Sequence, residues 1–255
     1  MTLQIVTIPC LSDNYAYLAH DPATGATAAV DVPEAAPIIV ALTAQGWTLS
    51  DVLLTHHHAD HVQGLPDLLA AAPARVNGAA ADAHRLPPLD VALNEGDTVR
   101  IGTEEGRVID VSGHTVGHIA FHFPDSRAAF TADSLMALGC GRVFEGTMPQ
   151  MHESLAKLAA LPPETMIYSG HEYTQTNAKF AMTVDPDNPR LKSRVKEIDA
   201  ARAAGKPTVP STLEEELATN PFLRASDPDV QAHLGMVGVE PGTVFAEIRA
   251  RKDRF

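Results

Sequence analysis

The segment that most constrains this chain is THHHADH, residues 55–61, which directly follows the apolar run DVLL at 51–54. The apolar run predicts a buried strand, so four histidines and an aspartate gather where a strand ends. Alternate residues of an extended segment point to the same side. His56 and His58 can therefore converge on one metal ion, while His57 points elsewhere.

The same segment has ligands left for a second ion, because Asp60 and His61 lie one step further round the loop. Imidazole and carboxylate groups suit Zn²⁺, Fe or Mn²⁺. Two adjacent half-sites in one loop predict a binuclear metal centre.

A binuclear centre needs ligands from elsewhere in the chain, and three later strands end in such residues. His114 follows the apolar run GRVIDV, Asp133 ends AAFTAD, and His171 follows MIYSG, each beside a small residue. The predicted ligand sets are His56, His58 and His114 for one ion and Asp60, His61 and His171 for the other, with Asp133 bridging both. His57 and His118 lie inside the motifs and could orient a ligand through a hydrogen bond. We expect the other histidines to be structural: His20, His84, His122, His152 and His233.

The order of the predicted elements indicates two sheets covered by helices. Residues 3–32 predict an antiparallel meander, followed by a helix over 34–47 and another over 62–73. Short strands dominate residues 74–133, and a helix over 152–161 precedes a final strand. After residue 173 the strand signal disappears and every segment predicts helix. The Ala-rich segment 81–90 predicts a surface excursion.

Composition narrows the classes of protein that fit. The chain has 255 residues, 45% of them hydrophobic, enough for one large core and a smaller appendage. A formal net charge of −13 argues against a nucleic-acid partner, because phosphate binding needs a clustered basic face. We find no export signal and no apolar run long enough to span a membrane, and the two cysteines form no disulfide framework. These features predict a cytoplasmic protein with no membrane partner.

The spacing H-x-H-x-D-H with three later ligands resembles the metallo-β-lactamase superfamily. The resemblance implies an α/β fold, the αββα sandwich, here followed by a small C-terminal α-helical domain. We therefore expect a catalytic domain at residues 1–172 and a helical substrate-binding domain at 173–255. The superfamily includes lactamases, nucleases, dioxygenases and thioesterases, so the fold alone does not name the reaction.

A narrower resemblance covers essentially the whole chain. The segments SGHTVGHI, FTADSL, CGRVFEGT, SGHEYT, PTVPSTLEEELATNPFLR and RARKD are similar to those of the glyoxalase II, or hydroxyacylglutathione hydrolase, family. The resemblance implies that five residues hold the glutathione part of the substrate: Arg142, Phe144, Tyr173, Arg249 and Lys252. Members of the family often carry Tyr where this chain has Phe144, which removes a hydroxyl contact. Arg142 stands where some relatives have Lys, which keeps the charge but changes its geometry.

The implied reaction is hydrolysis of S-(2-hydroxyacyl)glutathione thioesters, such as S-D-lactoylglutathione to glutathione and D-lactate, in methylglyoxal detoxification. Two divalent ions per chain, zinc first with iron or manganese as alternatives, would lower the pKa of a shared water from ~15.7 toward neutrality and supply a metal-bound hydroxide. Asp60 is the predicted catalytic residue, because it can orient this hydroxide as well as ligate. The expected partner is the small glutathione thioester, and family analogy suggests a monomer.

Other functions remain open. An iron persulfide dioxygenase of the same superfamily needs only two histidines and one carboxylate. A non-catalytic role would leave the substrate-gripping residues unexplained, and a nuclease would need a basic groove. Without the resemblance, Arg249 and Lys252 could be the solvated end of a terminal helix, where cations favour the helix dipole. Tyr173 could likewise be a core tyrosine, and Arg142 an ordinary loop charge.

Overall fold

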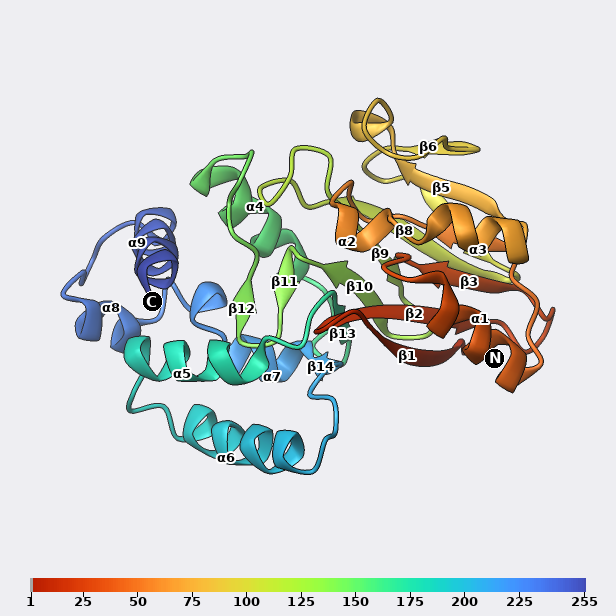
Figure 1. Ribbon diagram of the computed structural model, residues 1–255. Coiled ribbons are helices and arrows are strands. Elements are labelled where there is room, and N and C mark those ends of the chain that lie inside the picture. The colour runs from red at the N-terminus through yellow and green to blue at the C-terminus, as the bar shows by residue number, and fades with distance from the viewer. Residues whose placement is uncertain (1) are drawn as a thin grey trace.

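Two facing β-sheets with helices on their outer sides form the larger part of the molecule (Figure 1). The computed structural model describes residues 2–255, so Met1, with which the predicted catalytic domain begins, lies outside the described residues. In the described part, the first sheet has six strands in the order β1 (Gln4–Cys10), β2 (Asn14–His20), β3 (Thr27–Val30), β4 (Asp51–Leu53), β5 (Arg75–Ala79) and β6 (Val91–Leu93). The second runs in the order β14 (Ser211–Thr212), β13 (Met166–Ser169), β10 (Ala128–Ala132), β9 (Ile119–Phe123), β8 (Glu104–Asp110) and β7 (Thr98–Ile101).

The first sheet changes from antiparallel to parallel at β3. The strands β1, β2 and β3 pair antiparallel, as the predicted meander requires, whereas β3, β4, β5 and β6 pair parallel. Parallel strands bring their carboxyl ends to one edge of a sheet. Asp31, directly after β3, therefore lies beside the histidine segment that follows β4, and its N–H bonds the carbonyl oxygen of Leu53 at 3.0 Å.

The two sheets are joined at this same edge. Tyr15 of β2 donates its backbone N–H to the carbonyl oxygen of Gly170, directly after β13, at 2.8 Å, and Glu172 donates to the carbonyl oxygen of Asp13 at 2.8 Å. In the second sheet, β10 and β13 are parallel. The residues that follow these two strands, Asp133 and His171, therefore emerge close together.

Helices cover the outer faces and form the C-terminal part. Beside the first sheet lie α1 (Ala35–Gln45), α2 (Ala59–Val62), α3 (Leu65–Ala71) and the short η1 (Ala80–Asp82), and α4 (Met148–Ala159) covers the second sheet. The helix α4 begins with a capping box between Thr147 and Gln150. The remaining helices are α5 (Thr174–Val184), α6 (Pro189–Ala203), α7 (Leu213–Thr219), η2 (Pro221–Leu223), α8 (Pro228–Leu234) and α9 (Pro241–Arg254). A small hairpin, β11 (Leu135–Met136) with β12 (Gly139–Cys140), lies between the sheets and these helices (Figure 1).

The central strands β9 and β10 of the second sheet are buried on both faces, which explains their largely apolar sequences, whereas β7 and β8 alternate buried and exposed residues. Phe121 and Phe130 join the core between the sheets, whereas Ala120 and Ala129, one position away, join a second apolar cluster. That second cluster also contains residues of α4, α5, η2 and α9, including Phe245. The C-terminal helices therefore share a core with the sheet that carries Asp133 and His171.

Two expectations about local structure need correction. The helix expected over 62–73 is the shorter α3, and residues 59–62 of the expected metal-binding loop form the separate helix α2. Between them, a Cβ on Gly64 would lie 2.8 Å from the backbone of Ala35. The segment 81–90 is not simply a surface excursion, because Asp82 is 1% exposed and Leu86 is buried. Both differences arise from contacts with segments that are distant in the sequence, and the local sequence pattern does not reveal such contacts.

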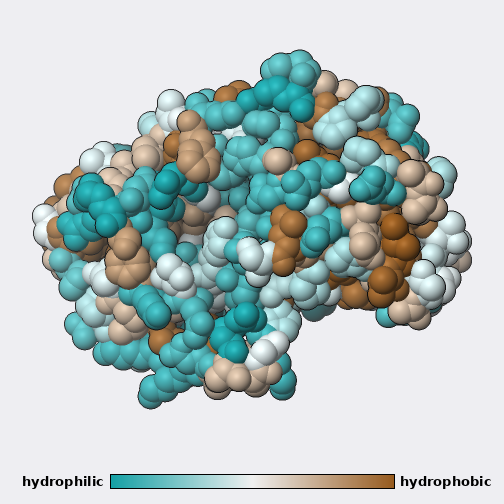
Figure 2. All heavy atoms as spheres, viewed as in Figure 1, coloured by the Kyte–Doolittle hydropathy of each residue, from teal (hydrophilic) through white to brown (hydrophobic). Residues whose placement is uncertain are grey.

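The surface seen in Figure 2 is mostly hydrophilic, with hydrophobic patches over the side of the molecule that carries α1 and α3. Within residues 2–255, no helix combines the length and apolar character needed to cross a bilayer.

Candidate active site

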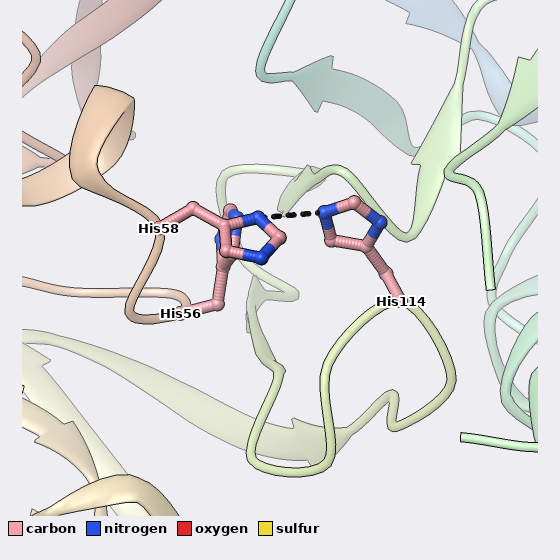
Figure 3. Close-up of side chains that lie close together, drawn as sticks. All are labelled: His56, His58 and His114. Atoms are coloured by element: carbon pink, nitrogen blue, oxygen red, sulfur yellow. Dashed lines mark hydrogen bonds between the residues drawn. The ribbon is translucent and has the colours of Figure 1, made fainter. Parts of the chain in front are cut away.

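Three histidines predicted for one ion point toward one another (Figure 3). His56 and His58 lie in the loop after β4, and His114 lies between β8 and β9. His58 Nδ1 is 3.0 Å from His114 Nε2, and one nitrogen of each of the three histidines lies within 4.8 Å of the others. The Nε2 of His56 is buried without a hydrogen-bond partner among the described residues. A buried polar atom without a partner is costly unless a ligand satisfies it.

The second predicted set also converges. His61 Nε2 lies 3.4 Å from His171 Nε2, and Asp60 Oδ2 is 3.4 Å from His171 Nε2 and 3.7 Å from His61 Nε2. These residues come from opposite sheets, because His61 starts from the first and His171 from the second. The second ligand set therefore forms at the edge where the two sheets are joined.

Asp133 lies between the two sets. Its Oδ2 is 3.4 Å from His114 Nε2 and 3.4 Å from His171 Nε2, and its Oδ1 is 3.4 Å from His61 Nε2. One carboxylate therefore reaches a member of each set, as a bridging ligand would.

The spacing of these atoms fits metal ligands. Zinc binds imidazole nitrogen at about 2.0–2.1 Å, so two ligand atoms of a tetrahedral ion lie roughly 3.3 Å apart. The separations of 3.0 Å between His58 and His114 and of 3.4 Å between His61 and His171 are close to that value. The fold and the donor set together suit divalent metal ions.

Most of the converging histidines have their other ring nitrogen fixed by a hydrogen bond. His61 Nδ1 bonds Asp31 at 2.8 Å, His171 Nδ1 bonds Asp13 at 2.9 Å, and His114 Nδ1 bonds the carbonyl oxygen of Arg142 at 2.8 Å. Such bonds set the tautomer and the direction of a ligating imidazole. The side chain of Asn14 likewise donates to Asp60 Oδ2 at 3.0 Å.

The charge states of His56 and Asp133 suit a cation, whereas Asp133 outweighs the effect of burial and raises the pKa of His61 and of His171 above the usual value. Burial lowers the pKa of His56 well below its usual value, and His61 and His118 lower it further, so His56 is neutral at pH 7. Burial raises the pKa of Asp133, but His61 and His171 outweigh this effect and hold that pKa well below its usual range. A neutral imidazole and an ionised carboxylate are the forms that bind metal.

The chain approaches the cluster so closely at two positions that only glycine fits. A Cβ on Gly170 would lie 2.5 Å from Asp133 Oδ1 and 2.7 Å from His61 Cε1. A Cβ on Gly141 would lie 2.1 Å from the carbonyl oxygen of Asp133 and 2.9 Å from His114 Nδ1. Any larger residue there would displace a predicted ligand.

A cleft of about 400 Å³ opens beside the cluster. The structure brings all the predicted substrate-binding residues to its wall: Arg142, Phe144, Tyr173, Arg249 and Lys252. Phe144 is 60% exposed, which leaves its ring free for contact, and the ring of Tyr173 stacks on His171 with centroids 4.5 Å apart.

The cations of the cleft differ in their surroundings. Arg249 is 4% exposed and donates from Nη1 to the carbonyl oxygen of Cys140 at 2.9 Å. Asp253 pairs with Arg249 Nη2 at 2.9 Å and with Arg142 Nε at 3.3 Å. Lys252 Nζ lies 5.2 Å from the ring centres of both Phe180 and Phe255.

Comparison with known proteins identifies the family. The family model of the metallo-beta-lactamase superfamily matches residues 21–171, and that of the hydroxyacylglutathione hydrolase C-terminus matches residues 172–255. The hydroxyacylglutathione hydrolase of Jannaschia sp. (strain CCS1) is 70% identical over 252 residues, which cover 99% of this chain and 98% of that protein. The chain belongs to the hydroxyacylglutathione hydrolase family. The resemblance predicted for the whole chain is therefore confirmed.

Solved structures confirm the predicted αββα fold of this family member. BLEG-1 B3 metallo-beta-lactamase matches with a TM-score of 0.67 at 20% identity, covering 86% of this chain and 99% of that one. TTHA1623, solved in a di-iron-bound form, matches with a TM-score of 0.61 at 26% identity, covering 86% of this chain and all of that one (100%).

Several residues near the cluster escaped sequence reasoning. Asp31 ends the strand-like run TAAVD much as Asp133 ends AAFTAD, and that likeness was a usable signal. The sequence contains no such signal for Asp13, which lies in a turn, or for Asp253, which lies at the charged end of a helix. His118 lies against His56 by ring stacking, with centroids 4.6 Å apart, rather than through a hydrogen bond.

Proposed function

We propose that this chain hydrolyses S-(2-hydroxyacyl)glutathione thioesters, with S-D-lactoylglutathione as the principal substrate, to glutathione and D-lactate in methylglyoxal detoxification. The proposal rests on one observation, that the ligand cluster and three cations share one cleft. Membership of the hydroxyacylglutathione hydrolase family makes the chain a thioester hydrolase.

We assign the metal-binding role to seven residues: His56, His58, Asp60, His61, His114, Asp133 and His171. Two divalent ions per chain are proposed, zinc first, with iron or manganese as alternatives that the same ligands accept. The di-iron form of TTHA1623 supports a two-ion centre. Such ions, when bound, act as Lewis acids and lower the pKa of a coordinated water toward neutrality.

Asp60 is assigned as the catalytic residue that orients the attacking water. Its carboxylate lies at the cleft wall and is held by the side chain of Asn14 at 3.0 Å. The water oxygen bonds the acyl carbon, the carbon–sulfur bond breaks, and glutathione leaves as its thiolate. The proton lost by the water ends on solvent or on that thiolate.

The cations and rings of the cleft hold glutathione. Arg142, Arg249 and Lys252 supply local positive charge for its two carboxylates, which an acidic chain otherwise repels. Burial raises the pKa of Tyr173, and Asp13 raises it further, so the phenol keeps its proton and can donate to the substrate. Phe144 contributes an apolar contact without a hydroxyl group.

We also propose a domain boundary, an oligomeric state and a location for the protein. We propose a boundary near residue 172 between a catalytic domain and a helical substrate-binding domain, and a monomeric enzyme by family analogy. A cytoplasmic location suits a glutathione-dependent reaction, because the cytosol maintains a pool of glutathione.

The direct test is hydrolysis by the protein purified with its native metals. We expect loss of the thioester absorbance of S-D-lactoylglutathione, abolished by a chelator and much slower with a thioester that lacks glutathione. A metal-loaded protein that leaves the glutathione ester intact but consumes oxygen with glutathione persulfide would instead be a dioxygenase.

A further inference from the structure

A connected group of side chains outside the proposed ligands lies beside the cleft. His57 Nδ1 donates to Asp82 Oδ2 at 3.0 Å. Arg85 donates to Asp82 Oδ1 from Nη2 at 2.5 Å and from Nε at 3.2 Å. Its Nη1 and Nη2 also donate to the two carboxylate oxygens of Glu145, at 2.5 and 2.9 Å. We name these four residues the Arg85 network.

One end of the Arg85 network lies in the metal-binding loop. His57 stands between the proposed ligands His56 and His58, and its own ring faces Asp82, which is 1% exposed. The backbone of the three histidines is continuous. Fixing the ring of His57 therefore restricts the directions in which its two neighbours point.

The other end lies in the loop that holds the substrate. Glu145 directly follows Phe144 in the segment 140–147, which also carries Arg142. Its Oε2 accepts the backbone N–H of Val116, in the loop that carries His114, at 2.9 Å. A single carboxylate thus ties the substrate-binding loop to a ligand-bearing loop.

Two glycines allow the loops joined by the network to pack closely. A Cβ on Gly117 would lie 2.2 Å from Asp82 Cγ, and a Cβ on Gly146 would lie 2.7 Å from Gly113 Cα. Close-packed loops transmit small displacements to one another. A shift of Asp82 would therefore reach the loop of His114 directly.

Arg85 is the cation that balances both carboxylates. Hydrogen bonds from Arg85 lower the pKa of Glu145 to about 2, so that carboxyl group is ionised at physiological pH. Without Arg85, Asp82, which is almost fully buried, would keep among the described side chains only the hydrogen bond from His57. A planar guanidinium can serve two carboxylates at once, whereas an ammonium group cannot reproduce this fork.

We propose that Arg85 is a positioning residue that couples the metal-binding loop to the substrate-binding loop through Asp82 and Glu145. The proposal rests on the proposed function, because that function assigns metal ligands to one loop and glutathione contacts to the other. Arg85 does not line the cleft and is not among the proposed metal ligands. It acts by keeping His57 and Glu145 at a fixed separation.

The test compares Arg85→Met with wild type and with the control variant Arg100→Met. In the control, the exposed ion pair between residue 100 on β7 and Glu105 on β8 is lost. For Arg85→Met we expect zinc transfer to a chromogenic chelator about tenfold faster and a KM for S-D-lactoylglutathione about tenfold higher. Arg85→Lys should recover only part of each effect. Arg100→Met should match wild type in both measurements.

A double-mutant comparison tests the coupling itself. Glu145→Gln should raise KM in the wild-type background but add little in Arg85→Met, because the same link is already broken. Effects that multiply independently would contradict coupling through Arg85.

A purely structural role predicts a different result. Arg85→Met would then melt at a lower temperature, with zinc transfer and KM unchanged, and the proposal would be wrong. The chelator assay does not depend on turnover. It therefore still tests whether Arg85 positions the metal-binding loop, even if the wild-type protein hydrolyses no glutathione thioester. In that case the proposed function fails independently, and binding of glutathione measured by calorimetry replaces KM.

Discussion

Arg249, on the last helix, donates a 2.9 Å hydrogen bond to the carbonyl oxygen of Cys140, the last residue of β12. The bond joins the C-terminal end of the chain to the hairpin that forms one wall of the cleft. A cation proposed to hold substrate therefore also holds the wall in place.

Arg249→Met should raise KM for the glutathione thioester at least about tenfold, because a charge-assisted hydrogen bond is lost. It should also destabilise the protein, since the carbonyl oxygen of Cys140 loses the hydrogen bond from Arg249 and Asp253 keeps only its pair with Arg142. Steady-state kinetics and urea unfolding measure the two effects. Arg251→Met, which removes an exposed pair with Glu247 on the same helix, is the matched control. Equal KM values for the two variants would contradict the assignment.

Asp133→Ala should remove metal from both sets at once, because Asp133 reaches His114 on one side and His61 and His171 on the other. We expect metal content measured by mass spectrometry to fall from two ions per chain toward none. The fully exposed Asp187 supplies the control, Asp187→Ala. Retention of one full equivalent would mean that Asp133 serves a single ion.

Phe144→Tyr should lower KM about two- to tenfold, the effect of one added hydrogen bond, with kcat nearly unchanged. The ring is 60% exposed at the cleft, so a hydroxyl group can be added without displacing a neighbour. Phe144→Ala should raise KM. A Tyr variant that binds no better would show that the hydroxyl group of relatives points away from glutathione.

The KM should depend on pH through Lys252. Burial and the nearby Arg249 lower its pKa to about 8, so the side chain is charged below that pH and neutral above it. Affinity for an anionic substrate should therefore be present at pH 7 and weaken as the pH rises to 9. Lys252→Arg stays charged over this range and should flatten the dependence. Kinetics at constant ionic strength distinguish the two profiles.

Glu216→Ala should cost about 3–5 kcal/mol of unfolding free energy, because the buried Arg194 loses its nearest charged partner and keeps only the partly exposed Glu215, 3.4 Å from its Nε. Glu216 also accepts the backbone N–H of Leu138, between β11 and β12, at 2.8 Å. The exposed neighbour Glu214, paired with Arg190, is the control, and Glu214→Ala should cost less than about 1 kcal/mol. Chemical denaturation measures both variants, and similar losses would refute a special role for Glu216.

The ligand cluster was accessible to sequence reasoning because each of its members follows a strand whose apolar pattern is visible. Asp133, His171 and His114 stand one, two and four residues beyond the ends of β10, β13 and β8. Long strands and amphipathic helices were predictable for the same reason. The short strands β6, β11, β12 and β14 were not, since no period can be read from so few residues. The three-residue β4 is the exception, because its apolar run extends to Leu54.

The partners that orient the cluster depend on tertiary structure. The contact of His171 with Asp13 spans 158 positions, and no local pattern encodes it. Asp82 and Arg85 lie in a segment whose alanines and prolines predict a surface loop, yet they contact the two loops of the site. Such residues become visible only when distant segments are placed together.

The joining of β2 to the residue after β13 also has a consequence for how the protein is made. Tyr15 is synthesised early, but its partner Gly170 and the ligand His171 emerge only after two thirds of the chain. Contacts between residues so far apart form late in folding, because a long loop must first close. A nascent chain can therefore expose the histidines of residues 56–61 without a completed second set while the next 110 residues, 62 to 171, are added. We expect metal to be captured tightly only after residue 171 has emerged from the ribosome.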